Sequence, residues 1–324
     1  MGGTPPRRER RRATLTRVRK LPRYVRLRAV RAANRALAAG EGRRGGDEHP
    51  LSRPPLFVVG APRSGSTLLY QALVRAFAVG YLSNRHCRLY GAPSLVERLW
   101  HPEPPAEFSS RFGRTEGAAA PSECGEFWYR FFPRSPQYVP LEAAEPSRLR
   151  ALRAAVRALG DAAGKPLVFK NLLCTLRLAP IAAALPEAVF VVVRRDLVAN
   201  AASLLAARRA VHGDHASWWS AEPPGIEELR ALPPHEQVVE QVRRIEALVE
   251  RDQEAIGSER FLVLRYEQLC ADAESSMRAV AELAERNGFR LERRRPIPAE
   301  FRRSGELQID GELHERIVEY VERG

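Results

Sequence analysis

Residues 56–73, "LFVVGAPRSGSTLLYQAL", join a short apolar run to a glycine-containing turn and then to a helical pattern. Leu56–Val59 has the length and composition of a buried strand. The apolar side chains after the turn fall on one helical face, namely Leu68, Leu69, Ala72, Leu73, Ala76 and Phe77. A strand that turns directly into a helix aims backbone N–H groups and the positive helix end at one point. We therefore expect an anion-binding loop here.

The turn departs from the loop that binds nucleoside triphosphates. That loop reads G-x-x-x-x-G-K-[ST], where Lys reaches the β and γ phosphates and Ser or Thr holds Mg²⁺. Gly60 and Gly65 have the same separation and Thr67 has the hydroxyl position, but Ser66 stands where the lysine would be and Arg63 is the nearby cation. The ligand should carry less charge at its far end. A divergent P-loop kinase or nucleotidase remains an alternative.

The rest of the chain alternates strand and helix patterns. Apolar runs at 167–169, 189–193 and 261–264 predict further buried strands, and helical patterns cover 197–210, 236–256, 273–287 and 311–322. This alternation predicts an α/β fold, a P-loop-like doubly wound parallel sheet flanked by helices. Two stretches, 79–140 and 211–235, lack either pattern, and loops of that length are usually lids or substrate walls. We expect them to form the acceptor side of a site.

The positive charge is concentrated at the N-terminus. The chain carries a net charge of +13, of which residues 1–50 contribute +11 (15 Lys+Arg and 4 Asp+Glu). We therefore divide the chain into a basic Arg-rich extension and linker, 1–50, and one domain, 51–324. In the extension Tyr24, Leu27, Val30 and Leu37 have helical spacing, as in a helix that lies on a membrane or nucleic acid. A solvated, partly disordered extension is the other interpretation, because Pro22 interrupts the pattern.

Other features narrow the class of protein. No apolar stretch is long enough for a signal peptide or a membrane span, so a cytoplasmic protein is expected. We expect no specific nucleic-acid partner, although a nucleic-acid- or membrane-surface-binding protein that acts through the basic tail remains an alternative. The four cysteines, Cys87, Cys124, Cys174 and Cys270, lie far apart in the sequence. We therefore expect reduced thiols and no disulfide framework. His212 and His215 form an H-x-x-H without a second ligand pair, so no metal site is expected.

A second anion site follows a predicted strand. Arg194, Arg195 and Asp196 come directly after the run 189–193, and Ser203 lies eight residues beyond Arg195. Eight helical residues rise about 12 Å. Arg195 and Ser203 can therefore meet one ligand only if Arg195 precedes the helix and reaches back along it.

At this pair the sequence resembles the sulfotransferases that use 3′-phosphoadenosine 5′-phosphosulfate (PAPS). Their loop P-[KR]-S-G-[ST]-[ST], which holds the 5′-phosphosulfate, is matched by Pro62–Thr67. Their R-D-P segment with a Ser eight residues after its Arg, which holds the 3′-phosphate, is matched by Arg195 and Ser203, although Leu197 replaces the Pro. Their Y-E-D-L-like element is matched by "YEQL", which places Tyr266 by the nucleotide. The resemblance covers about residues 55–290.

The resemblance implies in-line transfer of a sulfuryl group from PAPS to a hydroxyl or amine, without a metal. The implied nucleotide-binding residues are Arg63, Ser64, Gly65, Ser66, Thr67, Arg195, Ser203 and Tyr266. Arg63 would neutralise the leaving group, and Lys170 corresponds to a family lysine that contacts the transferred group. Leu172 stands where small-molecule enzymes of the family have a catalytic His.

The base must therefore come from elsewhere. Glu123 in the first long loop is the first choice, with Glu126 next, and His86 and His101 are weaker candidates because a lone loop histidine is usually incidental. The segment "FRRSGEL" is similar to a nucleotide-binding element of some relatives through Arg302, Arg303 and Gly305, or is a simple basic loop. Trp218 and Trp219 are expected in the lid or acceptor wall. A small-molecule, lipid or glycan acceptor stays open, as does peripheral membrane contact through the extension.

Overall fold

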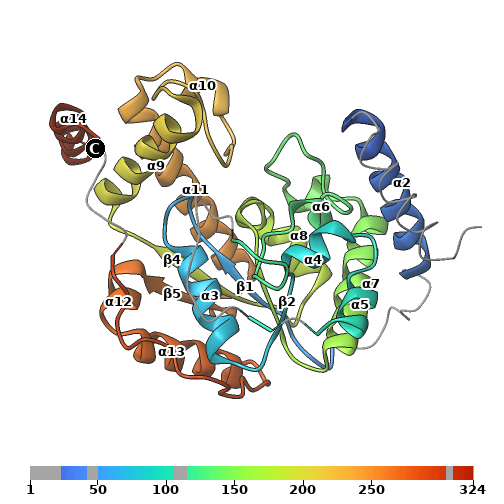
Figure 1. Ribbon diagram of the computed structural model, residues 1–324. Helices are drawn as coiled ribbons and strands as arrows, with labels where there is room; N and C mark the ends of the chain where they lie inside the picture. The colour runs from blue at the N-terminus through green and yellow to red at the C-terminus, as the bar shows by residue number, and fades with distance from the viewer. Residues whose placement is uncertain (1–22, 42–49, 102, 105–114, 304–308, 324) are drawn as a thin grey trace, which may run out of the picture.

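The computed structural model describes residues 23–41, 50–101, 103–104, 115–303 and 309–323. Within these ranges five strands form one all-parallel sheet in the order β2-β3-β1-β4-β5 (Figure 1). Their bounds are β1 Leu56–Val59, β2 Gly80–Tyr81, β3 Leu167–Lys170, β4 Val189–Arg194 and β5 Phe261–Arg265. After β1 the chain forms β2 and β3 on one side of this strand and then β4 and β5 on the other. A topological switch point therefore lies at the carboxyl end of β1. The α/β prediction is confirmed.

The central strand β1 is apolar throughout because helices cover both of its faces. Leu56 and Val58 of β1 face a core shared with α3 (Ser66–Ala76), α12 (Tyr266–Ala271) and α13 (Ala273–Arg286). Phe57 and Val59 face the opposite core, shared with α6 (Gly125–Trp128), α7 (Pro146–Ala163) and α8 (Leu178–Ala184). Alternate side chains of a strand point to opposite faces, so neither face of β1 tolerates a polar residue.

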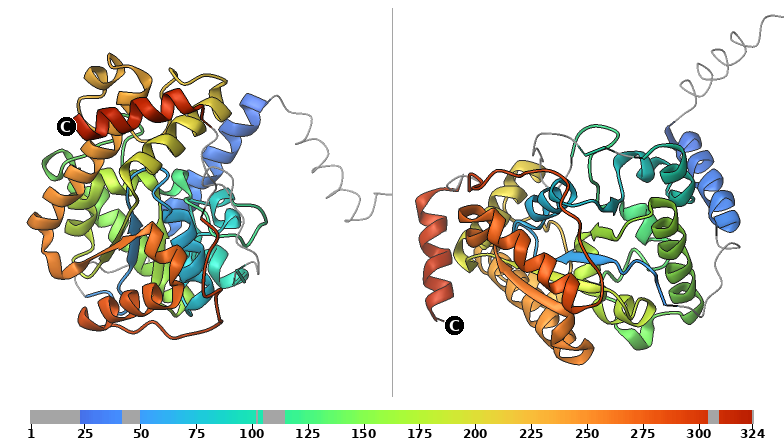
Figure 2. Two further views of the ribbon diagram at one scale, coloured as in Figure 1. Left: turned by 90° about the vertical axis from the view of Figure 1, so that its left-hand side faces the viewer. Right: turned by 90° about the horizontal axis from the view of Figure 1, so that it is seen from below.

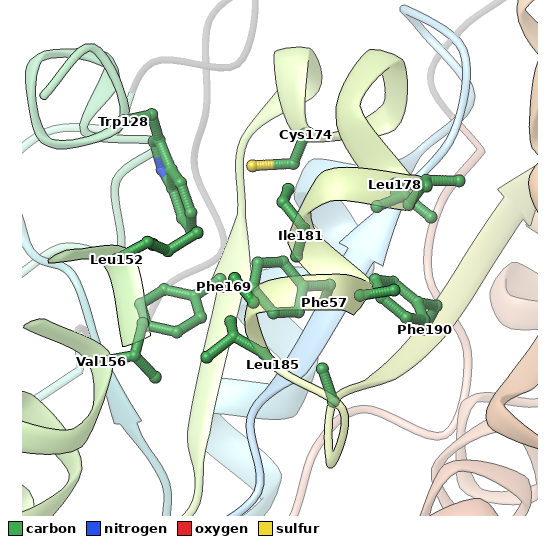
Figure 3. Packing of buried hydrophobic residues seen from close by; sticks show 14 of the residues in the cluster. Phe57, Trp128, Leu152, Val156, Phe169, Cys174, Leu178, Ile181, Leu185 and Phe190 are labelled. Atoms are coloured by element: carbon green, nitrogen blue, oxygen red, sulfur yellow. The ribbon is translucent and has the colours of Figure 1, made fainter. Parts of the chain in front are cut away.

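Aromatic rings fill the core on the α7 and α8 side (Figure 3). Phe57 lies between Phe169 of β3 and Phe190 of β4, with ring centroids 5.3 and 5.6 Å apart. The parallel register places these three residues opposite one another. Trp128 packs on the same ring at 5.8 Å. The stack fixes the position of β1, and with it the loop that follows.

A further group of helices begins with α9, which follows the carboxyl end of β4. It consists of α9 (Leu197–His212), α10 (Ile226–Arg230), α11 (Pro234–Ile256) and α14 (Gly311–Arg323). Leu204, Val242 and Ile317 lie in its core. No described helix has the length and apolar content to cross a bilayer.

The two stretches expected to be loops contain short elements. The first holds β2, α4 (Asn84–Arg88), α5 (Pro93–Leu99) and α6, and the second holds α10. Helices of four to seven residues are too short to show a helical period, and β2 has two residues. Three 3₁₀ turns, at Leu141–Ala143, Leu172–Arg177 and Ser258–Arg260, were likewise not predicted.

The basic extension contains a helix, α2 (Arg23–Glu41), that begins directly after Pro22. The buried side chain of Asn34 donates to the Arg88 carbonyl at 3.3 Å and accepts from the Gly91 amide at 2.8 Å. A Cβ on residue 91 would lie 2.0 Å from the Asn34 carbonyl oxygen. For residues 23–41 the helical interpretation is therefore the correct one. Figure 2 shows α2 alongside the α4–α5 segment.

Candidate functional site

The anion loop, residues 60–65, connects β1 to α3 in a conformation that requires both glycines. Gly60 has φ +145° and a Cβ there would lie 2.4 Å from the Val193 carbonyl oxygen. Gly65 has φ +97° and a Cβ there would lie 2.2 Å from Cδ2 of Tyr266. L side chains are unfavourable at such positive φ values. The loop is thereby held tightly against the ends of β4 and β5.

Two side chains from other elements anchor the loop. Thr175 Oγ1 accepts from the Gly60 amide at 3.1 Å and donates to the Gly60 carbonyl at 3.2 Å. Asn200 of α9 donates to the Pro62 carbonyl at 3.1 Å. Neither was predicted, because a hydroxyl or amide that supports a backbone turn has no local sequence signal.

The first turn of α3 faces a cavity of about 870 Å³. Gly65, Ser66 and Thr67 line it, and the first intrahelical bond runs from the Leu69 amide to the Gly65 carbonyl. The amides before Leu69 have no acceptor within the helix, and the helix dipole adds positive potential there. Ser64 does not line the cavity: its amide donates to the Ala61 carbonyl, and its hydroxyl is buried without a hydrogen-bond partner among the described residues.

Two arginines and a serine meet beside this helix end. Arg63 Nε donates to Ser203 Oγ at 3.2 Å, and Arg195 donates to the Arg63 carbonyl at 3.3 Å. The Arg195 guanidinium lies over the Tyr266 ring at 4.8 Å. Burial and the neighbouring charge of Arg195 lower the pKa of Arg63. Two close guanidinium groups favour a bound anion, because an anion offsets their mutual repulsion.

Arg195 and Ser203 are linked through Arg63, which accepts from Arg195 with its carbonyl and donates to Ser203 with its side chain; Arg195 lines the cavity and Ser203 does not. Arg195 precedes α9, which begins at Leu197, and Ser203 lies on the second turn. Arg63, expected near the transferred group, lines the cavity and donates from Nε to Ser203. Its backbone has a positive φ of 65°.

The opposite wall of the cavity carries an ion pair between Lys170 and Glu123. Lys170 ends β3 and donates from Nζ to Glu123 Oε1, while Oε2 accepts from the Leu172 amide at 3.1 Å. The Lys170 side chain is 5% exposed and that of Glu123 is 30% exposed. Asn171 and Trp128 donate to the Glu123 carbonyl at 3.0 and 3.1 Å. The carboxylate is therefore oriented by its neighbours and still open to the cavity.

Further polar side chains line the cavity. The sequence did not single out Gln71, Asn84, Thr115 or Ser122, all of which line it. Two of the cysteines, Cys87 and Cys124, also lie in this wall. Hydrogen bonding with the Cys124 and Ser122 side chains lowers the pKa of Cys87, against the effect of its burial.

The remaining base candidates are differently placed. Glu126 lines the cavity but pairs with Arg134 at 2.6 Å. His86 is fully buried, with Ser83 on Nδ1 and Glu97 3.3 Å from Nε2, and His101 is largely exposed. Neither histidine lines the cavity.

Of the lid and C-terminal residues that the structure describes, Trp219, Ser220 and Arg302 line the cavity. Arg303 does not, and Gly305 lies outside the described residues. Trp218 packs against Arg208, with 4.8 Å from the guanidinium to the ring centroid.

The kinase alternative depends on a carboxylate that could hold Mg²⁺. Asp196, the one Asp considered for Mg²⁺, caps α9 by accepting from the Ala199 amide at 2.9 Å. Across the described ranges, no three His, Cys, Asp or Glu side chains cluster as metal ligands would. His212 and His215 are part of no such group.

Comparisons with known proteins show the family of the chain. A profile described as "Sulfotransferase family" matches residues 54–287, well over half of the chain. The chain belongs to the sulfotransferase family. That range contains the loop, both arginines, Lys170, Glu123 and Tyr266. As a sulfotransferase, the chain is an enzyme that transfers sulfuryl groups.

Two solved sulfotransferases have a similar fold. STF9 from Mycobacterium avium is 18% identical, with a TM-score of 0.53, covering 94% of this chain and 79% of that one. STF1 from Mycobacterium tuberculosis H37Rv is 19% identical, with a TM-score of 0.50, covering 91% and 80%. No curated protein sequence gives a significant match.

Proposed function

We propose that this sulfotransferase uses PAPS as donor and a hydroxyl or amine as acceptor. The observation that carries the proposal is the meeting of three separate groups at the carboxyl end of the sheet: the α3 N-terminus, the Arg63–Arg195–Ser203 cluster and the Lys170–Glu123 pair. Two anion sites and one acid–base pair in a single cavity fit a ligand with two anionic ends and a reacting partner. When bound, PAPS supplies an activated sulfuryl group.

Different residues of the cluster and the loop would bind the two phosphate groups of PAPS. Arg195 and Ser203 would hold the 3′-phosphate, with Arg63 joining them through its contact with Ser203. The amides of Gly65, Ser66 and Thr67 would hold the 5′-phosphate at the helix N-terminus. Tyr266, whose ring supports Arg195, would lie by the nucleotide. Ser64 contributes through loop conformation, since its side chain lies outside the cavity.

Lys170 and Glu123 would act at the transferred group. An ammonium has three N–H donors, so Lys170 can keep its hydrogen bond to Glu123 and also donate to a sulfuryl oxygen. Lys170 and the Leu172 amide each hold one carboxylate oxygen of Glu123, which orients the group to accept a proton from the acceptor. The bond from the acceptor oxygen or nitrogen to sulfur forms as the bond to the 5′-phosphate breaks, and the proton goes to Glu123.

Calorimetric titration with the product nucleotide, 3′-phosphoadenosine 5′-phosphate, tests the donor site. Arg195→Ala should weaken binding by about 1.5–3 kcal/mol, the range for a hydrogen bond to a charged group. Arg194→Ala is the matched control, because Arg194 is the preceding arginine yet pairs with Glu250 at 2.6 Å. Equal affinities for the two variants, or a preference for Mg-ATP, would refute the donor assignment.

Glu123→Gln tests the base separately. It keeps the size of the side chain and should leave the nucleotide affinity within a fewfold of the parent value. Transfer of labelled sulfuryl from PAPS to an acceptor should fall by about 10²-fold or more, the usual contribution of a general base. Glu126→Gln should be nearly neutral, and full activity of Glu123→Gln would exclude Glu123 as the base.

A further inference from the structure

Exposed apolar side chains concentrate on one part of the surface. Among the described residues eight large apolar side chains are exposed, and five of them belong to α2 or to the segment 84–100. They are Val30, Leu89, Leu95, Leu99 and Trp100, with exposed fractions from 36 to 58%. Scattered exposed apolar residues need no explanation, but a contiguous group indicates an interaction site.

The segment of α4 and α5 presents a mixed basic and apolar edge. The exposed residues of α4 are Arg85 and Arg88, with the exposed Leu89 directly after the helix, and those of α5 are Leu95, Arg98 and Leu99. In α5 the spacing i, i+3, i+4 puts the three side chains on one face of the helix. We call these six residues, together with Val30, Arg31, Arg35 and Trp100, the α4–α5 face.

Direct contacts hold the parts of this face together. The Arg85 guanidinium lies 5.3 Å from the centroid of the Trp100 ring, which joins the edge of α4 to the end of α5. Asn34 seats α2 on the Arg88 carbonyl and the Gly91 amide, between α4 and α5. Figures 1 and 2 show α2 beside this segment in different views.

The charge of the face has a single sign. In residues 28–40 and 84–100 the exposed ionisable side chains are arginines, and the one acidic residue, Glu97, is buried and lies 3.3 Å from His86. A second copy of the chain docked through the same face would bring arginines against arginines. The partner should be anionic and should also accept Leu and Trp side chains.

An anionic lipid bilayer has both properties. Trp and Leu enter the boundary between headgroups and acyl chains, while Arg keeps its charged end at the phosphates. We propose that the α4–α5 face docks on the surface of an anionic membrane. The helix α4 contributes Asn84 and Cys87 to the cavity and Arg85 and Arg88 to the face, so docking brings the cavity wall next to the bilayer.

Vesicle co-sedimentation of the full chain tests this proposal. We expect binding to phosphatidylcholine vesicles that contain phosphatidylglycerol and little binding to phosphatidylcholine alone. The double variant Leu99→Ser/Trp100→Ser should lower the partition coefficient about tenfold by removing apolar contact, and Arg98→Gln about fivefold. The control Leu141→Ser/Val211→Ser removes apolar side chains of 46% exposure from other elements and should bind like the parent. Thermal unfolding shows that each variant is folded.

The basic residues 1–22 could bind such vesicles by themselves, so a probe specific to the face is needed. Trp100 is 45% exposed, whereas Trp128 is 1% exposed and the other two tryptophans are half-buried. Brominated lipids should therefore quench the fluorescence of the parent and not that of Trp100→Phe. Equal binding of the face variant and the control, without Trp100 quenching, would overturn the proposal. So would a concentration-dependent dimer that Leu99→Ser/Trp100→Ser abolishes in light scattering.

Discussion

A single methyl group at Gly65 tests how closely the anion loop and Tyr266 are packed. In Gly65→Ala the new Cβ would lie 2.2, 2.9 and 3.0 Å from three carbons of the Tyr266 ring. The ring must move, and forcing extra volume into a packed site costs about 1–3 kcal/mol. The φ of +97° adds about 1–2 kcal/mol of backbone strain. We expect a loss of roughly 2–5 kcal/mol of unfolding free energy.

Gly117→Ala is the matched control for strain alone. Gly117 has φ +93°, and a Cβ there would have no atom within 4 Å. It should lose only about 1–2 kcal/mol. At about 2–4 °C per kcal/mol, Gly65→Ala should melt several degrees below Gly117→Ala when both are followed by circular dichroism.

The displaced ring should also affect nucleotide binding, because Arg195 lies over it. We expect Gly65→Ala to weaken the affinity for 3′-phosphoadenosine 5′-phosphate at least about tenfold, and Gly117→Ala to leave it unchanged. In a Tyr266→Ala background the clash is absent, so adding Gly65→Ala should cost only the strain. If Gly65→Ala and Gly117→Ala have the same Tm and the same affinity for the nucleotide, the described packing of the loop against Tyr266 is wrong.

Three further predictions concern single groups. Burial opposes ionisation of Glu187, but Arg153 and a backbone amide hold its pKa at about 2. This stabilisation is complete above the usual pKa and lost as pH falls toward 2, so Glu187→Gln should lower Tm at pH 7 and converge with the parent in acid. Cys87, with its lowered pKa, should be alkylated by iodoacetamide before the other cysteines and below pH 9, as peptide mapping would show; slower labelling than Cys270 would contradict this. Asp196→Ala should cost about 1 kcal/mol in urea unfolding through loss of the α9 cap, and a Mg²⁺-dependent Tm rise that it abolishes would instead support a kinase.

The sequence predicts the scaffold well because its signals are local. A strand such as β1 is an apolar run of the same four residues in the sequence and in the structure. The loop pattern and the eight-residue interval from Arg195 to Ser203 also survive folding, since each lies within one βα unit. Short helices such as α4 leave no period to read, and their arrangement depends on what they pack against.

The parts of the site that could not be predicted depend on residues far apart in the chain. No residue near Gly60 in the sequence indicates that its amide will donate to Thr175. Likewise, no residue near Lys170 indicates that it will form an ion pair with Glu123. Arg63 is the clearest case, because its motif gives a position in the loop while its side chain contacts Ser203, 140 residues further along the chain. Such contacts follow from tertiary packing, for which one sequence carries no local signal.

The central place of β1 bears on how the chain is made. Leu56 of β1 pairs with Val168 and Val189, so the strand leaves the ribosome long before either neighbour exists. Its apolar side chains have no sheet to enter during that interval, which favours capture by chaperones over early folding. The loop after β1 also leans on Tyr266, which follows the last strand. We expect nascent chains stalled before β5 to remain sensitive to protease and to acquire nucleotide protection only once that strand has emerged.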